Sequence, residues 1–197
     1  MNGIAFYGKM GAGKSTLANA LKNYYTNVRY DCYYYPITYS FGAGVKKCAK
    51  DYFDTEKKDR DLLVGIGMKM REVHEYVWVD YLHRSMQKDA KKCQQLKIRH
   101  IPIVDDLRFK NEYEYLKENG FKIVKVNIEP ELQEHRLRKL YPDDWETHIN
   151  YSSHVSENNV SENNVSENND LEYHLEVDSK DSVETNLNKI KTFLNLK

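Results

Sequence analysis

The segment GKMGAGKS, at residues 8–15, constrains the fold of this chain more than any other feature of the sequence. It fits the pattern GxxxxGK[ST], and it stands between a short apolar run at residues 3–7 and residues whose apolar side chains recur at helical spacing. Glycines let successive backbone N–H groups point at phosphate oxygens, and the positive end of the following helix attracts the same anion. The segment therefore predicts a strand, a phosphate-binding loop and a helix, rather than an ordinary glycine-rich turn.

Such a loop binds the phosphates of a nucleotide, and the roles of its residues follow from their chemistry. Lys14 is expected to reach the β- and γ-phosphates of ATP, and the Ser15 hydroxyl is expected to ligate Mg²⁺. ATP and Mg²⁺ are therefore the expected cofactors. We predict that the nucleotide contacts the following residues: Gly8, Met10, Gly11, Ala12, Gly13, Lys14, Ser15 and Thr16.

The remainder of the chain alternates between strand and helix patterns. Strands are expected at residues 3–7, 33–41, 98–104, 121–128 and 171–177, and those at 3–7 and 98–104 are expected to be buried. Helices are expected at residues 14–25, 42–53, 60–96 (as two helices), 111–119, 130–140 and 182–196. This alternation predicts an α/β protein in which helices cover both faces of a parallel sheet. Such a three-layer α/β/α arrangement binds ligands at the carboxyl ends of its strands.

Two adjacent carboxylates, Asp105 and Asp106, end the apolar strand at residues 98–104. An acidic side chain at this place, beside a phosphate-binding loop, commonly supports Mg²⁺ and its waters. Because consecutive strand residues face opposite sides, one aspartate should face the nucleotide while the other caps the loop. The sequence leaves open which of them faces Mg²⁺, and both could instead be turn residues.

Four arginines are candidates for binding phosphates during transfer of a phosphoryl group: Arg71, Arg108, Arg136 and Arg138. A phosphoryl transferase must neutralise the charge of both substrates and of the moving group, and arginine does so with two hydrogen bonds at once. Arg136 and Arg138 lie near the end of the expected helix 130–140, where a mobile lid over ATP would fit. The alternative is that these arginines are solvated surface residues.

Charge and composition argue against several other classes of protein. The 197 residues include 30 Lys and Arg and 30 Asp and Glu, so the net charge is zero and a nucleic-acid polymer is not an expected partner. The three cysteines form no CxxC pair, and HExxH and GxSxG patterns are absent, which argues against a zinc protease or a serine hydrolase. No secretory signal and no run of about 18 apolar residues occurs, so a cytoplasmic location without a membrane partner is expected.

The length is that of one α/β domain, and we expect a single domain over residues 1–197. Residues 155–169 consist of three tandem copies of VSENN. A polar repeat with one valine per copy cannot bury a core, and its period is too short for a solenoid. A disordered loop is expected there, and a repeated acidic contact surface is the alternative.

Several segments together resemble the deoxynucleoside monophosphate kinases of bacteriophages and other viruses. Besides the phosphate-binding loop, the similar segments are SFGAGVK at residues 40–46, LLVGIGMKMR at residues 62–71 followed by Trp78, and DDLRFKNE at residues 105–112. HVSE at residues 154–157 is similar to a further element of that family, although the repeat makes its counterpart ambiguous.

The resemblance implies a P-loop NTPase fold of the nucleoside monophosphate kinase type, with acceptor-binding and lid helices. The γ-phosphoryl group of ATP would be transferred to a (deoxy)nucleoside monophosphate. It implies that Arg71 and Arg108 bind phosphate, and that the acceptor also meets Lys46, Trp78 and Glu112. Small nucleotides would then be the partners, in the cytoplasm of a host cell if the protein is viral. The base, the sugar and the oligomeric state, a monomer or a homodimer, stay open.

Other nucleotide-binding proteins share parts of this pattern. A kinase acting on dephospho-coenzyme A or phosphomevalonate would have the same loop, lid and fold, and it is the nearest alternative. A GTPase would need an NKxD-type segment, which the sequence lacks. A nucleic-acid-dependent ATPase would need a second, helicase-like domain, and a nucleotide-binding module without catalysis would not need the strand-end acids.

Overall fold

The computed structural model describes residues 3–27, 33–54, 59–143, 145–146, 149 and 172–196 of the chain. Within these residues, a single sheet contains the strands β1 (Ile4–Tyr7), β2 (Tyr34–Tyr39), β3 (Arg99–Leu107), β4 (Lys122–Asn127) and β5 (Leu175–Asp178). The strand order is β2-β3-β1-β4-β5, and every neighbouring pair is parallel. The helices are α1 (Lys14–Asn27), α2 (Gly42–Phe53), α3 (Arg60–Val73), α4 (Val77–Gln95), α5 (Lys110–Glu118), α6 (Pro130–Leu140) and α8 (Val183–Phe193).

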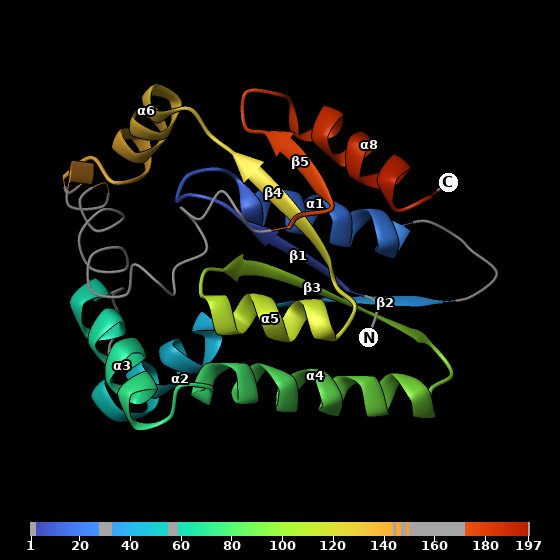
Figure 1. Ribbon diagram of the computed structural model, residues 1–197, viewed down its shortest axis with the longest axis horizontal. Helices are drawn as coiled ribbons and strands as arrows, with labels where there is room; N and C mark the ends of the chain where they lie inside the picture. The colour runs from blue at the N-terminus through green and yellow to red at the C-terminus, as the bar shows by residue number, and fades with distance from the viewer. Residues whose placement is uncertain are drawn as a thin grey trace.

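Helices cover both faces of the sheet, with α1 and α8 on one face and α4 and α5 on the other (Figure 1). The alternation of side chains along β1 shows how this arrangement arises. Ile4 and Phe6 pack with residues of α1 and α8, whereas Ala5 and Tyr7 pack with residues of α4 and α5. Because both faces of the strand are buried, all four of its side chains belong to the core. The three-layer α/β/α arrangement expected from the sequence is confirmed.

The strand β2 lies at an edge of the sheet, which explains how it tolerates Pro36 near its middle. The carbonyl oxygen of Tyr33 accepts a hydrogen bond from the N–H of Arg99, so Tyr33 faces β3. Backbone polar groups of consecutive residues point to opposite sides of a strand, so the position of Pro36 faces the open edge. A proline there removes no hydrogen bond within the sheet, and it discourages pairing with another strand.

Little of α3 is buried, although apolar residues recur along this helix. Gly67 alone is buried among the residues of this helix. Met70 is 38% exposed and Val73 is 83% exposed. The physical reason is that α3 lies beyond the sheet and packs mainly on α2, so no layer of strands covers it (Figure 1).

The other elements agree with the expected ranges except at their ends. β3 continues through the two aspartates to Leu107, and β5 ends one residue later than expected, at Asp178. The VSENN repeat at residues 155–169, the HVSE segment and Cys32 lie outside the described residues, so the expectations about them stay predictions. In the described ranges, no helix is both long enough and apolar enough to cross a membrane.

Candidate active site

The phosphate-binding loop lies between β1 and α1, and its backbone needs glycine at three positions. Gly8, Gly11 and Gly13 have φ angles of 138°, 81° and 93°, a region that other residues rarely adopt. A Cβ atom at Gly8 would also collide with the backbone carbonyl oxygen of Val126 in β4. The glycines of the motif are therefore required by the course of the loop, and they leave its N–H groups uncovered by side chains.

The ammonium group of Lys14 lies against the loop itself. Its Nζ atom donates hydrogen bonds to the carbonyl oxygens of Gly8 at 2.7 Å and Lys9 at 2.9 Å. The pKa of Lys14 is lowered to about 8, first by burial and then by the nearby Arg108 guanidinium, while the two strand-end carboxylates act in the opposite direction. A phosphate that arrives beside this ammonium would favour its charged form.

A cavity of about 470 Å³ lies beside the loop, between the carboxyl end of β3 and the helices α2 and α3. It brings together most of the residues that the sequence singles out: Met10, Gly11, Gly13, Lys14, Ser15, Thr16, Lys46, Arg71, Asp105, Asp106, Arg108 and Glu112. Outside its lining are Gly8, Ala12, Trp78, Arg136 and Arg138. Separate stretches of the chain thus meet at one cleft, at the carboxyl ends of the strands.

Asp105 and Asp106 face different neighbours, as the alternation of side chains along a strand predicts. Asp105 is hydrogen-bonded to the side chain of Ser15 in the loop, and burial raises the pKa of its carboxyl group. The Asp106 carboxylate instead accepts hydrogen bonds from three donors: the Ser40 hydroxyl at 2.5 Å and the N–H groups of Phe41 at 2.8 Å and Gly42 at 2.9 Å. Asp106 therefore binds the start of α2, and Asp105 faces the phosphate-binding loop.

The oxygen atoms around Asp105 suit a divalent cation that binds together with phosphate. Within the described residues, no group of three or more His, Cys, Asp or Glu side chains could hold a metal ion. The Ser15 hydroxyl and the Asp105 carboxylate are oxygen donors of the kind that Mg²⁺ prefers, and they are hydrogen-bonded to each other. Because Mg²⁺ usually combines one or two carboxylates with substrate phosphates and waters, this small donor set fits a metal that arrives with a nucleotide.

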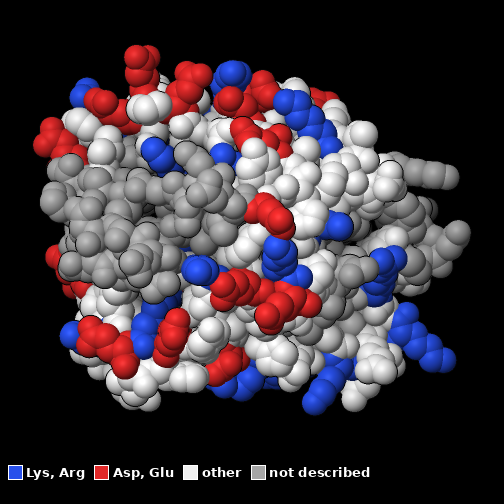
Figure 2. All heavy atoms as spheres, in the orientation of Figure 1, with Lys and Arg blue, Asp and Glu red and all other residues white. Residues whose placement is uncertain are grey.

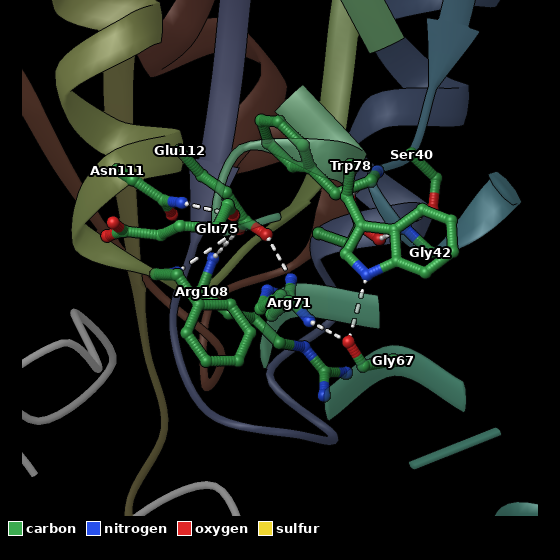
Figure 3. Close-up of polar contacts among 12 residues, drawn as sticks. Ser40, Gly42, Gly67, Arg71, Glu75, Trp78, Arg108, Asn111 and Glu112 are labelled. Carbon is green, nitrogen blue, oxygen red and sulfur yellow. Dashed lines mark hydrogen bonds and ion pairs between the residues drawn. The ribbon is translucent and has the colours of Figure 1, made fainter. Parts of the chain in front are cut away.

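On the α3 side of the cavity, the guanidinium group of Arg71 is held by three neighbours, of which Gly67 and Glu112 are labelled in Figure 3. Its Nη2 atom donates to Glu112 Oε1 at 2.8 Å, and its Nη1 atom donates to the carbonyl oxygen of Gly67 at 3.2 Å. The ring of Phe109 stacks against it, with 3.9 Å between Cζ of Arg71 and the ring centroid. The ion pair with Glu112 is largely buried, with side-chain exposures of 17% for Arg71 and 2% for Glu112.

Trp78 is packed beside α3 and lies outside the lining of the cavity, so its expected contact with an acceptor stays a prediction. It is 3% exposed, and its indole Nε1 donates to the carbonyl oxygen of Gly67 at 3.0 Å (Figure 3). Its ring packs against Gly44, so Trp78 of α4 contacts both α2 and α3. Lys46 and Arg108, in contrast, are exposed residues that line the cavity.

The two arginines expected on a lid belong to α6, and neither lines the large cavity. Arg136 donates to the carbonyl oxygens of Gly11 at 3.0 Å and of Ser179, directly after β5, at 2.7 Å. Arg138 forms an ion pair with Glu134, one turn earlier on the helix, at 2.6 Å. The side chain of Arg136 thus binds the backbone of the phosphate-binding loop, and Arg138 lies on the surface of α6.

A second cavity, of about 350 Å³, adjoins the same loop next to α6, and sequence reasoning misses it. Its lining includes Ser179, Asp181 and Asn186, from the turn between β5 and α8 and the start of α8. Ser179 and Asn186 are buried polar residues, and Oδ1 of Asn186 has no hydrogen-bond partner among the described residues. Ser179 comes just after a predicted strand, and this position is the sequence feature that could have identified it as lining a ligand site.

Charges of both signs are interspersed over the face of the molecule that Figure 2 shows. A protein that holds a nucleic-acid strand usually presents a basic stripe, which tracks the phosphates along the strand. The described part of this face lacks such a stripe.

Comparisons with known proteins identify the fold and no family. No protein-family model and no curated protein sequence matches the chain. Among solved structures, the chain is similar to a sugar kinase from Janibacter sp. HTCC2649, with a TM-score of 0.53 and 12% identity over 100% of this chain and 95% of that chain. It is also similar to shikimate kinase from Bacteroides thetaiotaomicron, with a TM-score of 0.51 and 16% identity over 100% and 99% of the two chains. An uncharacterized protein from Eubacterium ventriosum ATCC 27560 gives a TM-score of 0.56 and 16% identity over 98% and 97%. Together with the parallel sheet, these likenesses show that the chain has the three-layer α/β/α P-loop fold.

Proposed function

We propose that this protein is a P-loop kinase that transfers the γ-phosphoryl group of ATP to a nucleoside monophosphate, above all a deoxynucleoside monophosphate. The observation that carries the proposal is the composition of the 470 Å³ cavity, where the phosphate-binding loop faces a second group of cations. The fold adds support, because the sugar kinase and the shikimate kinase have the same architecture. The finer proposal is an enzyme of nucleotide biosynthesis that resembles viral deoxynucleoside monophosphate kinases and acts in the cytoplasm.

The donor side of the cavity is the loop and the start of α1. The loop N–H groups would hold the β- and γ-phosphates, and Lys14 would exchange its contacts with the Gly8 and Lys9 carbonyl oxygens for contacts with phosphate. Ser15 and Asp105 would hold Mg²⁺, which when bound neutralises charge on the phosphates. The second cavity, beside α6, has a suitable place and size for the adenine base.

The acceptor side offers two environments that match the two parts of a nucleoside monophosphate. Arg71, Arg108 and Lys46 supply positive charge for a phosphate dianion that must sit beside the negative phosphates of ATP. Apolar side chains that suit a flat base line the same cavity, namely Phe41, Val45, Leu63, Val64, Met68 and Phe109.

The carboxylates of the cavity favour an acceptor that arrives already ionised. A phosphate oxygen can attack the γ-phosphorus directly, while the bond between that phosphorus and the bridging oxygen of the departing ADP breaks. A hydroxyl acceptor would instead need a carboxylate to take its proton. Asp106 already accepts three hydrogen bonds, and Asp105 is engaged by Ser15. Glu112, the third carboxylate of the cavity, accepts hydrogen bonds from Arg71 and from two backbone N–H groups. All three carboxylates are therefore occupied with tasks other than that of a general base.

The nearest alternatives differ in the chemistry of the acceptor. Dephospho-coenzyme A accepts a phosphoryl group on a hydroxyl, so the engaged carboxylates argue against it. Phosphomevalonate accepts the phosphoryl group on a phosphate, yet it has no flat base to contact the apolar side chains that line the cavity. Both stay as comparison substrates for the test of the proposal.

The test is a panel of ribo- and deoxynucleoside monophosphates, each incubated with the protein and Mg-ATP, with the diphosphate product measured. Phosphomevalonate, dephospho-coenzyme A, shikimate and gluconate serve as parallel acceptors. We expect diphosphate from at least one monophosphate and no transfer to the hydroxyl acceptors. Transfer to a hydroxyl acceptor alone would overturn the nucleotide assignment.

A further inference from the structure

We propose that Glu112 is a positioning residue, which fixes the direction in which the Arg71 guanidinium presents its N–H groups to the acceptor phosphate without touching the acceptor itself. The proposal rests on the function proposed above. It gives Glu112 a role that differs from the direct acceptor contact expected from the sequence. Glu112 is well placed for this role, because it lies in the first turn of α5, shortly after the strand end that carries Asp105 and Asp106.

The Glu112 carboxylate borders the cavity, yet both of its oxygens are already used by the protein. Oε1 accepts a hydrogen bond from Arg71 Nη2 at 2.8 Å. Oε2 accepts from the N–H groups of Arg108 at 3.0 Å and Phe109 at 3.1 Å. The residue is 1% exposed, and a carboxylate would in any case repel a phosphate dianion. Glu112 therefore affects an acceptor through the cation that it holds.

Arg71 is restrained in three directions, so its guanidinium has one well-defined orientation. Nη2 is fixed by Glu112 and Nη1 by the carbonyl oxygen of Gly67 (Figure 3). The ring of Phe109 packs on the flat face of the guanidinium. A guanidinium has five N–H bonds, so these two hydrogen bonds leave donors that can bind two phosphate oxygens. A guanidinium that is already oriented loses less conformational freedom when it binds a phosphate. A small misplacement of the group that holds a substrate also lowers the reaction rate strongly.

The Glu112 carboxylate also connects the Arg71 guanidinium to the end of β3, the strand that carries Asp105. Oε2 binds the backbone of Arg108 and Phe109, and this backbone directly follows the end of β3. The Arg71 guanidinium is thereby fixed to the element that also carries Asp105. Glu112 thus sets where the acceptor phosphate lies relative to the γ-phosphate of the donor, which predicts an effect on kcat as well as on the acceptor KM.

A double-mutant cycle tests whether Glu112 acts through Arg71. Glu112→Gln keeps the volume of the side chain and removes its charge. Arg71→Ala removes the guanidinium group that is proposed to bind the acceptor phosphate. With the best monophosphate of the panel, assayed at about pH 8 so that Glu112 is ionised, we expect each single variant to raise the acceptor KM about tenfold or more and to lower kcat, while the KM for ATP stays within about twofold. In the Arg71→Ala background, Glu112→Gln should add nothing. Additive effects, or an unchanged acceptor KM in Glu112→Gln, would overturn the proposal.

Asn111→Ala is the matched control, because Asn111 precedes Glu112 on the same helix and is also buried. Its Nδ2 atom donates to the carbonyl oxygen of Glu75 at 3.0 Å, so it connects α5 to the α3–α4 turn without contacting Arg71 (Figure 3). We expect a lower melting temperature and an unchanged acceptor KM. An equal rise of KM in Asn111→Ala would mean that the effect of Glu112 is structural only. If Glu112→Gln does not fold, Glu112→Asp serves in its place, since it withdraws the carboxylate by one methylene.

A second readout separates failure of this proposal from failure of the proposed function. Side-chain ¹⁵N relaxation of Arg71 Nε reports how strongly the guanidinium is held, whether or not the protein turns over a monophosphate. We expect a restricted guanidinium in the wild type and a mobile one in Glu112→Gln. An absence of turnover with every monophosphate would overturn the function alone. Equal mobility of Arg71 in the two proteins would overturn the positioning role alone.

Discussion

At the scale of single residues, Asp105 and Asp106 are adjacent carboxylates with different neighbours, and their substitutions should differ accordingly. Asp105 faces Ser15 in the loop, so Asp105→Asn should weaken the proposed Mg²⁺ site. We expect the MgCl₂ concentration for half-maximal turnover to rise about tenfold or more, with little change in melting temperature. Turnover measured against MgCl₂ at fixed ATP checks this.

Asp106→Asn is the matched control, because it should act on stability instead. The carboxylate accepts three hydrogen bonds at the start of α2, and hydrogen bonds to charged groups contribute about 1.5–3 kcal/mol each. We expect the melting temperature to fall by roughly 5 °C or more, with an unchanged Mg²⁺ requirement in the folded protein. A shifted Mg²⁺ requirement in Asp106→Asn alone would reverse the assignment of the two residues.

Lys14 is a third residue whose role can be checked separately. Lys14→Ala removes the ammonium that lies within the loop, at 2.7 Å from the carbonyl oxygen of Gly8. We expect turnover to fall by about 10²–10³ because stabilisation of the transferred phosphoryl group is lost. The melting temperature should stay close to that of the wild type, since the two hydrogen bonds of Lys14 are made within a partly exposed loop. Near-normal turnover would reject the assignment of the phosphate-binding loop.

At the scale of elements, the contact between α2 and α4 supports α3, the helix proposed to bind the acceptor. A Cβ atom at Gly44 of α2 would lie 2.8 Å from ring atoms of Trp78 and 3.1 Å from Tyr81. Gly44→Ala should therefore force the two helices apart and destabilise the protein by about 1–3 kcal/mol. Because Trp78 also binds the carbonyl oxygen of Gly67, the acceptor KM should rise with it. Thermal melts and steady-state kinetics measure the two effects.

Gly65→Ala provides a control in α3 itself. A Cβ atom at Gly65 would meet nothing within 4 Å, and the residue is exposed in the middle of a helix. Alanine restricts the unfolded chain and favours the helix, so we expect stabilisation of about 0.5–1 kcal/mol. If Gly44→Ala stabilised the protein as well, the packing of α2 on α4 would be looser than the structure indicates.

At the scale of the whole molecule, Glu112 links stability to pH. Burial raises its pKa from 4.5 to about 7, although Arg71 and two backbone N–H groups oppose this shift. At pH values between 4.5 and about 7, the Glu112 carboxyl group is therefore protonated in the native protein and ionised in the unfolded chain. The stabilisation from this proton is complete below about pH 4.5 and is lost as the pH rises through about 7.

The measurement compares the free energy of unfolding of the wild type and of Glu112→Gln, by urea titration at several pH values between 5 and 8. Between about pH 5 and 7, we expect the wild type to lose about 1 kcal/mol per pH unit relative to the variant, and the loss should level off above pH 7. The corresponding difference between the wild type and Asn111→Ala should be flat. A flat difference for Glu112→Gln would show that the Arg71 ion pair keeps Glu112 ionised throughout.

Local patterns in the sequence determined the layered fold and the phosphate-binding loop of the candidate site. The loop at residues 8–15 and the alternation of strands with helices predicted a parallel sheet that is covered on both faces, because glycine φ angles and side-chain periodicity are properties of short segments. The sequence also singled out Arg71, Arg108 and Lys46, which do line the cavity beside the loop.

The tertiary structure alone decided which neighbours those side chains have. Asp105 and Asp106 are equivalent in the sequence, and the proximity of α2 determines that Asp106 binds the start of that helix. Trp78 is buried behind α3, and Arg136 binds the loop backbone. The physical reason is that these contacts join residues that are far apart in the chain, so they depend on how the layers pack and not on the propensity of any segment.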